Sequence, residues 1–399
     1  MPASFSRQAA LLAAGMLATG TANTLLTKLQ DKQCVANCDD PDPANRRLFE
    51  QPVWQTLNMF YGEMLCLACL YLARLCAPPA AATDAAAAGD AAAAAAPPGY
   101  EPIADEDDED DDDGVPELRG DNASPSPTPA LKPIAGCATL WMWVPAACDL
   151  LGTTLMNVGL FFTSASVYQM LRGAVVIFSG IFSVLFLGHR LDRSQVASLG
   201  MVVVGVTIVG LSNVISPPVA VYAQWRAGES ADPTALKAAL GVVLVLGAQI
   251  FTATQFVVEE KILRRYHLTP LRAVGLEGSF GAATVMAAIP VLHFAFGRAD
   301  PGGYFDAPAG FRQIVENPSV WQTSIYIMVS IALFNYFGLS VTRYLSATSR
   351  ATIDTCRTLF IWMSSLALGW EAFSWVQVLG FAILVYGTFV YNRVIAAPF

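Results

Sequence analysis

The stretch SVYQMLRGAVVIFSGIF, residues 166–182, contains one charged side chain, Arg172, and the ten residues that follow it carry no charge. With its apolar neighbours the stretch is long enough to cross a membrane, because a hydrocarbon core about 30 Å thick needs about 20 helical residues. An arginine inside such a helix costs at least about 2.5–3.5 kcal/mol to insert. The stretch therefore indicates a membrane helix in which Arg172 has a specific role.

The composition of the whole chain is that of a membrane protein. Of its 399 residues, 54% are hydrophobic and 14% are charged, whereas a soluble domain has about 25% charged residues. Apolar runs rich in small residues and flanked by Trp and Tyr favour membrane helices over barrel strands. We predict ten spans, over 7–28, 54–75, 139–162, 164–187, 192–213, 236–258, 271–296, 320–342, 346–368 and 373–395. The first run could be a signal peptide, but its helical continuation NTLLTKLQ favours an uncleaved helix.

Two parts of the chain, 159–191 and 338–373, repeat the same order of features. Each has Gly-Leu near the end of one helix, then Ser-Ala-Ser (164–166) or Ser-Ala-Thr (346–348), then an apolar helix that ends on Leu-Gly. The repeat unit is then five helices, and an odd number makes the second copy cross the membrane in the opposite sense. Inverted repeats are typical of secondary transporters, with the binding site near the midplane. We therefore expect an all-α polytopic membrane protein built from two inverted five-helix repeats.

An acidic, low-complexity segment interrupts the first repeat. We assign helices 1–2 of that repeat to 1–76, its helices 3–5 to 138–213, and the second repeat to 236–399. Residues 77–137 are mostly Ala, Pro, Ser and Gly, and their run ADEDDEDDDDG (104–114) supplies most of the net charge of −9. Such a segment has too little apolar surface to offset its ordering entropy. We expect a disordered, solvated spacer, with binding of a basic partner as the alternative.

The two repeat blocks, SASVYQMLRGAVVIFSGIFSVLFLGHRL and LSATSRATIDTCRTLFIWMSSLALGWEAF, resemble the drug/metabolite transporter superfamily. With EEK (259–261) and LRAVGLEGSFG (271–281) they more narrowly resemble the F branch of solute-carrier family 35, which is EamA-like. The resemblance covers nearly all of the chain except loops near 30–52, 77–137 and 297–319. It implies a ten-helix transporter of an endomembrane, lysosomal or Golgi. Nucleotide-sugar members carry Phe-Tyr-Asn-Asn and Gly-Ala-Leu-Asn-Lys motifs; here only LFNYFG is faintly similar to the first, which favours another cargo.

Lys and Arg residues near the predicted helix ends favour one orientation. With a cytosolic N-terminus, the cytosolic loops hold Arg190, Arg193, Arg343 and the cluster EEKILRRYHLTPLR (259–272). The loops on the other side hold fewer and more scattered cations. We therefore expect both termini and the acidic segment to lie in the cytosol.

Cysteine and histidine spacing gives no sign of a cofactor site. Cys34 and Cys38 share the first loop on the luminal side, where a disulfide is permitted, and a local disulfide and free thiols are both open. His189, His267 and His293 are far apart in sequence, and none lies at ligand spacing from a CxxC motif. We expect no metal, no cofactor and no nucleic-acid partner.

Several predicted spans contain ionisable residues, which membrane helices rarely hold: Glu63, Asp149, Arg172, Glu277, Asp354 and Arg357. Counted from the Ser-Ala element, Arg172 corresponds to Asp354, so the two should lie within about 5 Å of each other in depth. Arg357 follows one turn later on the same face. Such residues usually face the bundle interior or a water-filled cavity. We predict that they line a substrate cavity; a buried ion pair that only fixes helix packing is the alternative.

Polar residues beside these charges are weaker candidates. Asn23, Gln169 and Asn335 either line the same cavity or form hydrogen bonds between helices. Glu259 and Glu260, at the cytosolic end of a predicted span, form either a solvated cluster or a gate.

Together these features favour a secondary transporter of a small organic solute that carries an anionic group and crosses the bilayer by alternating access. The acids outnumber the arginines, so proton coupling is expected. A polytopic enzyme is disfavoured because no Ser/His/Asp or HExxH arrangement is present. A non-transporting scaffold is the other alternative, since fold does not determine function. The oligomeric state is not predicted.

Overall fold

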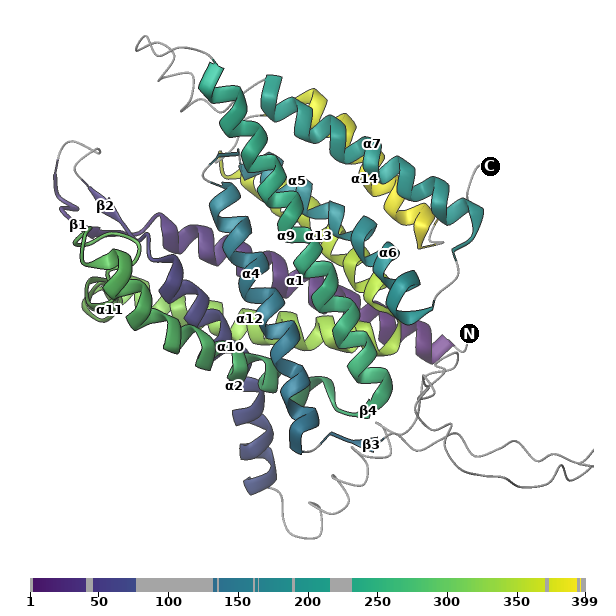
Figure 1. Cartoon of the computed structure of the whole chain (residues 1–399), viewed down its shortest axis with the longest axis horizontal. Helices are drawn as coiled ribbons and strands as arrows, with labels where there is room; N and C mark the ends of the chain where they lie inside the picture. Colours follow the sequence, from purple (N-terminus) through teal and green to yellow (C-terminus); the bar gives the residue numbers. More distant parts are fainter. Residues whose placement is uncertain are drawn as a thin grey trace, which may run out of the picture.

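The computed structural model describes residues 3–40, 46–76, 132–134, 136–160, 162–163, 165–188, 191–215, 232–369, 373–392 and 395. Nearly all of this part of the chain is helical, and the helices form one bundle (Figure 1). The acidic run at 104–114, predicted to be a disordered spacer, lies outside the described residues.

The long elements follow the predicted order along the chain. The helices are α1 (Ala3–Asp31), α2 (Pro52–Cys76), α4 (Trp143–Leu160), α5 (Ala165–Leu171), α6 (Val175–Leu187), α7 (Arg193–Ile215), α9 (Asp232–Arg265), α10 (Pro270–Leu292), α11 (Ala307–Glu316), α12 (Pro318–Tyr344), α13 (Ala347–Ala367) and α14 (Trp375–Tyr391). Shorter elements are the 3-10 turns η2 (Gly136–Met142) and η3 (Arg172–Ala174), the π-turn η4 (His293–Gly297), and the strands β1 (Cys34–Ala36), β2 (Arg47–Leu48), β3 (Lys132–Pro133) and β4 (Tyr266–His267).

Seven helical segments among the described residues are long and apolar enough to cross a membrane: Arg7–Asp31, Pro52–Ala73, Val167–Leu187, Arg193–Leu211, Ala238–Arg265, Pro270–Gly297 and Pro318–Tyr344. The chain is therefore an integral, multi-pass membrane protein. Helices α4, α13 and α14 also occupy predicted ranges but do not meet the same criterion. Helices α4 and α13 are too polar, because α4 contains Asp149 and α13 contains Arg350, Asp354 and Arg357. Helix α14 is apolar but too short, with 17 residues.

The range predicted as one helix, 164–187, is interrupted at its arginine. Helix α5 ends at Leu171, the 3-10 turn η3 begins at Arg172, and α6 begins at Val175. A Cβ atom on Gly173 would lie 2.7 Å from the side chain of Leu384 in α14, so glycine permits this close approach. A 3-10 turn within a helix often marks a hinge or a functional site. Periodicity alone gave no sign of the break.

Four helix pairs have the most extensive contacts: α7 with α14, α4 with α9, α2 with α10, and α1 with α12. Each pair joins a helix from the first half of the chain to one from the second half, so the halves interlock. Figure 1 shows α7 and α14 side by side at one edge of the bundle. There the backbones approach so closely that a Cβ atom on Gly205 would lie 2.6 Å from the backbone nitrogen of Leu384.

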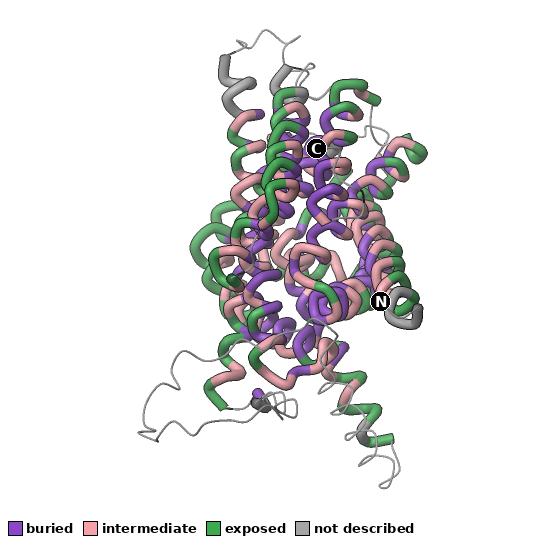
Figure 2. The backbone as a smooth tube through the Cα atoms, turned by 90° about the vertical axis from the view of Figure 1, so that its right-hand side faces the viewer, coloured by how far each residue is buried: buried purple, intermediate pink, exposed green. Residues whose placement is uncertain are grey.

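Buried residues lie where helices face one another, and exposed residues follow their outer faces (Figure 2). The largest buried cluster joins α5, α7, α9, α13 and α14 through residues such as Leu171, Val209 and Leu384. Large apolar side chains on the outer faces include Leu185, Val243 and Val291, each at least 63% exposed. Exposed apolar surface on this scale suits a lipid environment.

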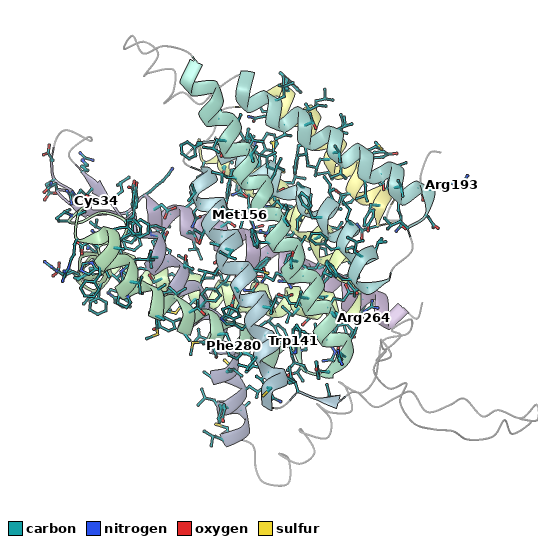
Figure 3. The ribbon with its side chains drawn as sticks, viewed as in Figure 1. Cys34, Trp141, Met156, Arg193, Arg264 and Phe280 are labelled. Atoms are coloured by element: carbon teal, nitrogen blue, oxygen red, sulfur yellow. A yellow bond between two sulfur atoms is a disulfide. The ribbon has the colours of Figure 1, made fainter. Side chains whose placement is uncertain are left out.

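The two ends of the bundle differ (Figure 3). The hairpin end, which contains Cys34, has the antiparallel pair β1–β2 and helix α11. Cys34 and Cys38 form a disulfide there, which answers the question that the sequence left open. The basic end, which contains Arg264, has the parallel pair β3–β4, which ties residues 132–133 to Tyr266 and His267.

Candidate functional site

Helix α13 carries the charged side chains around which the site is built. Arg350, Asp354 and Arg357 follow one another at i, i+4 and i+7, so they share one face of the helix. All three are at most 4% exposed. The helix begins at a Ser346 cap, whose side chain accepts a hydrogen bond from the backbone N–H of Ser349. These charged residues lower the mean hydropathy of the helix, and they are buried because this face points into the bundle.

The first group, here called the arginine cluster, consists of Arg172, Asp354 and Arg357. Arg172 Nη2 lies 3.8 Å from Asp354 Oδ2, and Arg357 Nε donates a hydrogen bond of 2.8 Å to Asp354 Oδ1. The repeat alignment thus correctly placed Arg172 next to Asp354. One carboxylate faces two guanidinium groups, which leaves one positive charge in excess. The Arg172 side chain is 18% exposed and is the most accessible of the three.

Helices α1 and α12 hold Arg357 in place. Its Nη1 atom donates to the carbonyl of Gly20 at 3.3 Å and to Thr24 Oγ1 at 3.0 Å. Its guanidinium also lies over the ring of Phe334, 4.9 Å from the ring centroid. Arg357 is therefore a fixed charge, whereas Arg172 makes a longer contact.

The second group, here called the acid cluster, brings together Glu63 of α2, Asp149 of α4, Glu259 of α9, Glu277 of α10 and Arg350 of α13. Arg350 forms an ion pair with Glu259 and lies over the ring of Phe256, 4.1 Å from the ring centroid. The three glutamates are at most 3% exposed. Four carboxyl groups thus face one guanidinium group.

Two amide side chains complete the acid cluster. Asn335 Nδ2 donates to Glu63 Oε1 at 2.5 Å, and Gln255 Nε2 donates to Glu277 Oε1 at 2.8 Å. Of the amides predicted to line the cavity, Asn335 therefore belongs to this group. Asn23 instead accepts a hydrogen bond from Ser330 at 2.9 Å, between α1 and α12.

Gln169 is the third predicted amide. It is 7% exposed, and its Oε1 atom has no hydrogen-bond partner among the described residues. It lies on α5, one turn before Arg172. Its contacts therefore do not assign it to either cluster.

The sequence did not identify Glu259, Arg350 or Gln255 as site residues. The solvated alternative for Glu259 and Glu260 is wrong, because both are 1% exposed. Helix α9 continues to Arg265, beyond the predicted end of its span, and keeps both acids inside the bundle. Glu260 accepts a hydrogen bond of 2.5 Å from the backbone N–H of Ala347, at the start of α13. Arg350 could have been found, since it lies inside a predicted span.

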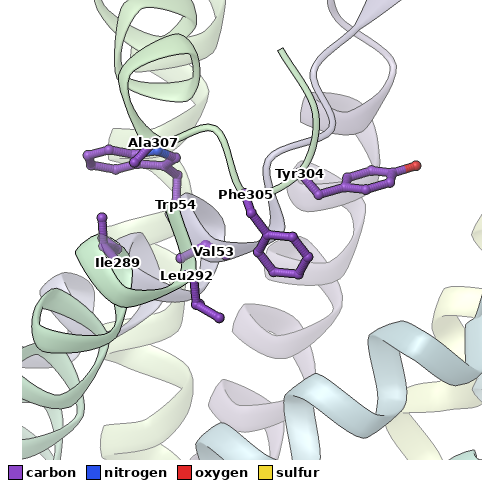
Figure 4. A pocket seen from close by; sticks show the side chains of 7 residues that line it. All are labelled: Val53, Trp54, Ile289, Leu292, Tyr304, Phe305 and Ala307. Atoms are coloured by element: carbon purple, nitrogen blue, oxygen red, sulfur yellow. The ribbon is translucent and has the colours of Figure 1, made fainter. Parts of the chain in front are cut away.

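A shallow apolar pocket opens at the hairpin end, away from both clusters (Figure 4). It is lined by Val53, Trp54, Ile289, Leu292, Tyr304, Phe305 and Ala307. None of the predicted cavity residues lines it, so it is a different feature. Within the described part of the chain, no three His, Cys, Asp or Glu side chains are grouped so that they could hold a metal ion.

Sequence comparisons place the chain among membrane carriers. Solute carrier family 35 member F6 of Homo sapiens is 36% identical over 385 residues, which is 96% of this chain and 88% of the relative. The protein of the same name in Mus musculus is 34% identical, with 96% and 87% covered. An uncharacterised protein of Schizosaccharomyces pombe is 38% identical over 65% of this chain and 76% of its own length.

A solved structure has a fold similar to that of this chain. One crystal structure of a protein superposes with a TM-score of 0.51 over 97% of each chain, at 12% sequence identity, and this likeness concerns the fold alone. No family model matches the chain. The relatives that cover almost the whole sequence decide the family. The chain is a multi-pass membrane protein of the transporter type and belongs to solute carrier family 35, in the drug/metabolite transporter superfamily.

Proposed function

We propose that this chain is a secondary carrier that moves a small organic solute with an anionic group across an endomembrane by alternating access. The observation that carries the proposal is the arginine cluster, in which Arg172 and Arg357 share the single carboxylate of Asp354. Two arginines in a membrane bundle are costly unless they bind something. The excess positive charge suits a carboxylate or a phosphate, which a guanidinium binds through two donors.

Alternating access needs two halves that can exchange roles, and the helix contacts support such a relation. In the proposed inverted repeat, the five spans α1, α2, α4, α5–α6 and α7 correspond to α9, α10, α12, α13 and α14. Under this correspondence, the contact of α4 with α9 becomes the contact of α12 with α1, and both are among the most extensive. The contact of α6 with α9 likewise becomes that of α13 with α1. Ten spans in two inverted halves account for these pairs.

The arginine cluster lies where the two proposed repeats meet. Arg172 comes from η3 and Asp354 from the equivalent helix, α13. The break at η3 gives Arg172 a hinge that a continuous helix would lack. A solute anion that competes with Asp354 for Arg172 would therefore change the contact between the halves. This is the step that would couple binding to movement.

The proposed orientation places the basic end in the cytosol, with both termini on that side and the hairpin end in the lumen of a lysosome or a Golgi compartment. The basic residues at 259–272 support this, because cytosolic loops are enriched in Lys and Arg. The disulfide between Cys34 and Cys38 also supports it, since disulfides persist in oxidising compartments. Proton coupling through the buried acids is part of the proposal.

The first test is a thermal-stability screen of the purified protein against nucleotides, nucleotide sugars, amino acids and short peptides. A solute that binds only the folded state at about 100 times its Kd adds about 2.7 kcal/mol of stability. We expect at least one anionic solute to stabilise the wild type and to lose this effect in Arg172→Ala. If every solute leaves stability unchanged, the scaffold alternative replaces the carrier.

A further inference from the structure

The acid cluster contains more negative groups than its surroundings can neutralise. Four carboxyl groups face the single guanidinium of Arg350. Arg172 lies within electrostatic range of Asp149, and Asp354 lies within electrostatic range of Arg350. Arg172 and Asp354, however, pair with each other in the arginine cluster. Other groups around the acids are the amides of Gln255 and Asn335, the hydroxyl of Thr153 and the thiols of Cys66 and Cys148. A buried carboxylate without a partner costs several kcal/mol.

The hydrogen bonds show where the missing positive charge enters. Asn335 occupies Glu63 Oε1, whereas Glu63 Oε2 is buried and has no hydrogen-bond partner among the described residues. Glu259 uses its Oε2 atom for Arg350, whereas its Oε1 atom is also buried and has no hydrogen-bond partner among the described residues. A proton on a neighbouring carboxyl group would supply a donor to such an oxygen. Grouping suited to a metal ion is absent from the described residues. The ligand that fits these contacts is the proton.

The same acids are mechanically connected to the basic end of α13. Glu259 pairs with Arg350 in the first turn of that helix, and its neighbour Glu260 accepts the hydrogen bond from the Ala347 backbone. The end of α9 thus clamps the start of α13 through two adjacent carboxylates. A proton on Glu259 would cancel the charge that holds Arg350 and leave one of the two contacts.

We propose that the acid cluster is the proton site of the carrier and that the Glu259–Arg350 ion pair transmits its occupancy to the basic end of α13. This inference rests on the proposed carrier function, and it separates coupling from cargo. Protons on Glu63, Asp149 and Glu277 neutralise the cluster while Glu259 stays paired with Arg350, and a further proton on Glu259 is the one that opens the clamp. The solute binds the arginine cluster. Protonation loosens the clamp between α9 and α13, and deprotonation restores it.

Infrared spectroscopy of the full-length protein in liposomes tests the site with the proton itself as the probe. A protonated carboxyl group has a carbonyl stretch that is resolved from the bands of an ionised carboxylate. With one arginine for four acids, neutrality needs about three protons, so Glu63→Gln and Glu277→Gln should each lower the band area by about a third. Arg350→Gln should raise it by about a third, because a fourth acid then needs a proton.

Two other acids provide matched controls. Asp354 is paired with two arginines, so Asp354→Asn should leave the band area unchanged, and so should Glu316→Gln at an exposed site in α11. If Arg350→Gln does not fold, the two glutamate variants still decide the question. A wild type with no such band at neutral pH, or a band that both glutamate variants leave intact, overturns the inference.

Spin labels at Lys261 and Leu345 report on the clamp, because both positions are exposed at the basic end of α9 and next to α13. In a background without reactive cysteines, we expect Glu259→Gln to shift the label distance to longer values, as acidification does in the parent. Glu316→Gln should leave it unchanged. An unchanged distance in Glu259→Gln refutes the transmission step. The infrared result does not depend on any cargo, so a failed solute screen would reject the carrier proposal and leave the proton site standing.

Discussion

The two charged clusters share helix α13 and both lie largely inside the bundle, but their charge balance is opposite. In the arginine cluster, two guanidinium groups face one carboxylate, and every group has a partner. In the acid cluster, four carboxyl groups face one guanidinium. Burial alone therefore does not decide the state of these groups; the number of counter-charges does. In our proposal, the first cluster binds the anionic cargo and the second carries the coupling protons.

The largest expected effect is on the arginine cluster. Arg172→Ala and Asp354→Ala should abolish solute transport while both proteins still reach their membrane, because each change removes one side of the 3.8 Å contact. Uptake into liposomes, with surface and organelle staining in cells, measures both properties. Full transport by Arg172→Ala would refute the binding role.

The packing alternative for the same pair makes a different prediction. If Arg172 and Asp354 only fix the helices, both single variants should misfold, since a buried charge without its partner costs about 3–5 kcal/mol. The exchange of Arg172→Asp with Asp354→Arg should then restore expression and activity together. A folded exchange variant without transport would support the binding role.

The acid cluster should show a smaller, pH-specific effect. Glu63→Gln and Glu277→Gln should retain downhill transport and lose its acceleration by a proton gradient, because the variants remove proton sites and leave the cargo site intact. Gln255→Leu and Asn335→Leu remove the amide donors instead and should weaken the acceleration only in part, as expected for a hydrogen bond worth about 1–3 kcal/mol. Equal loss of downhill transport in all four variants would show that the two clusters act as one site.

The sequence predicted those features of the clusters that depend on local patterns, and it missed those that depend on contacts between distant residues. The hydrophobic runs predicted helices in the correct places, and the repeat predicted that Arg172 meets Asp354. The partnership of Glu259 with Arg350 was missed, because the two residues are far apart in sequence and α9 extends beyond its apolar run. Whether the polar end of a helix is buried depends on its neighbours, which periodicity does not report.

The break at η3 was missed for a related reason. The residues around Arg172 and Gly173 have the composition of an uninterrupted membrane helix. The close approach of Leu384 from α14 at this point is a tertiary contact. The site was therefore predictable as a set of charges, and its division into two clusters was not.

Orientation decides which compartment supplies the protons. Asn122 begins the sequon NAS, residues 122–124, in the acidic segment outside the described residues. If the basic end is cytosolic, as proposed, Asn122 should carry no glycan, and glycosidase treatment of protein from animal or plant cells should leave its mass unchanged. A glycan at Asn122 would show that the orientation is the reverse of the one proposed, with the clamp between α9 and α13 on the luminal side.

The smallest effect is expected where acidic residues are most abundant. Deletion of 80–130 removes 14 acidic residues and one arginine, yet the protein should still extract and purify as a single species, since none of the described contacts depends on that segment. The spacer predicted from the sequence extends to residue 137. The structure moves this limit, because Lys132 and Pro133 pair with β4.

Ile134 provides the matched comparison for that deletion. It is 2% exposed and packs with Ile262, Leu263 and Leu268 at the end of α9, beside the clamp of the acid cluster. Ile134→Ala should cost about 2–5 kcal/mol, as truncation of a buried side chain does, and its thermal unfolding should show this against the 80–130 deletion. Aggregation of the 80–130 deletion would mean that the acidic segment has a structural role. An Ile134→Ala variant as stable as the wild type would mean that Ile134 does not anchor this end of the segment to α9.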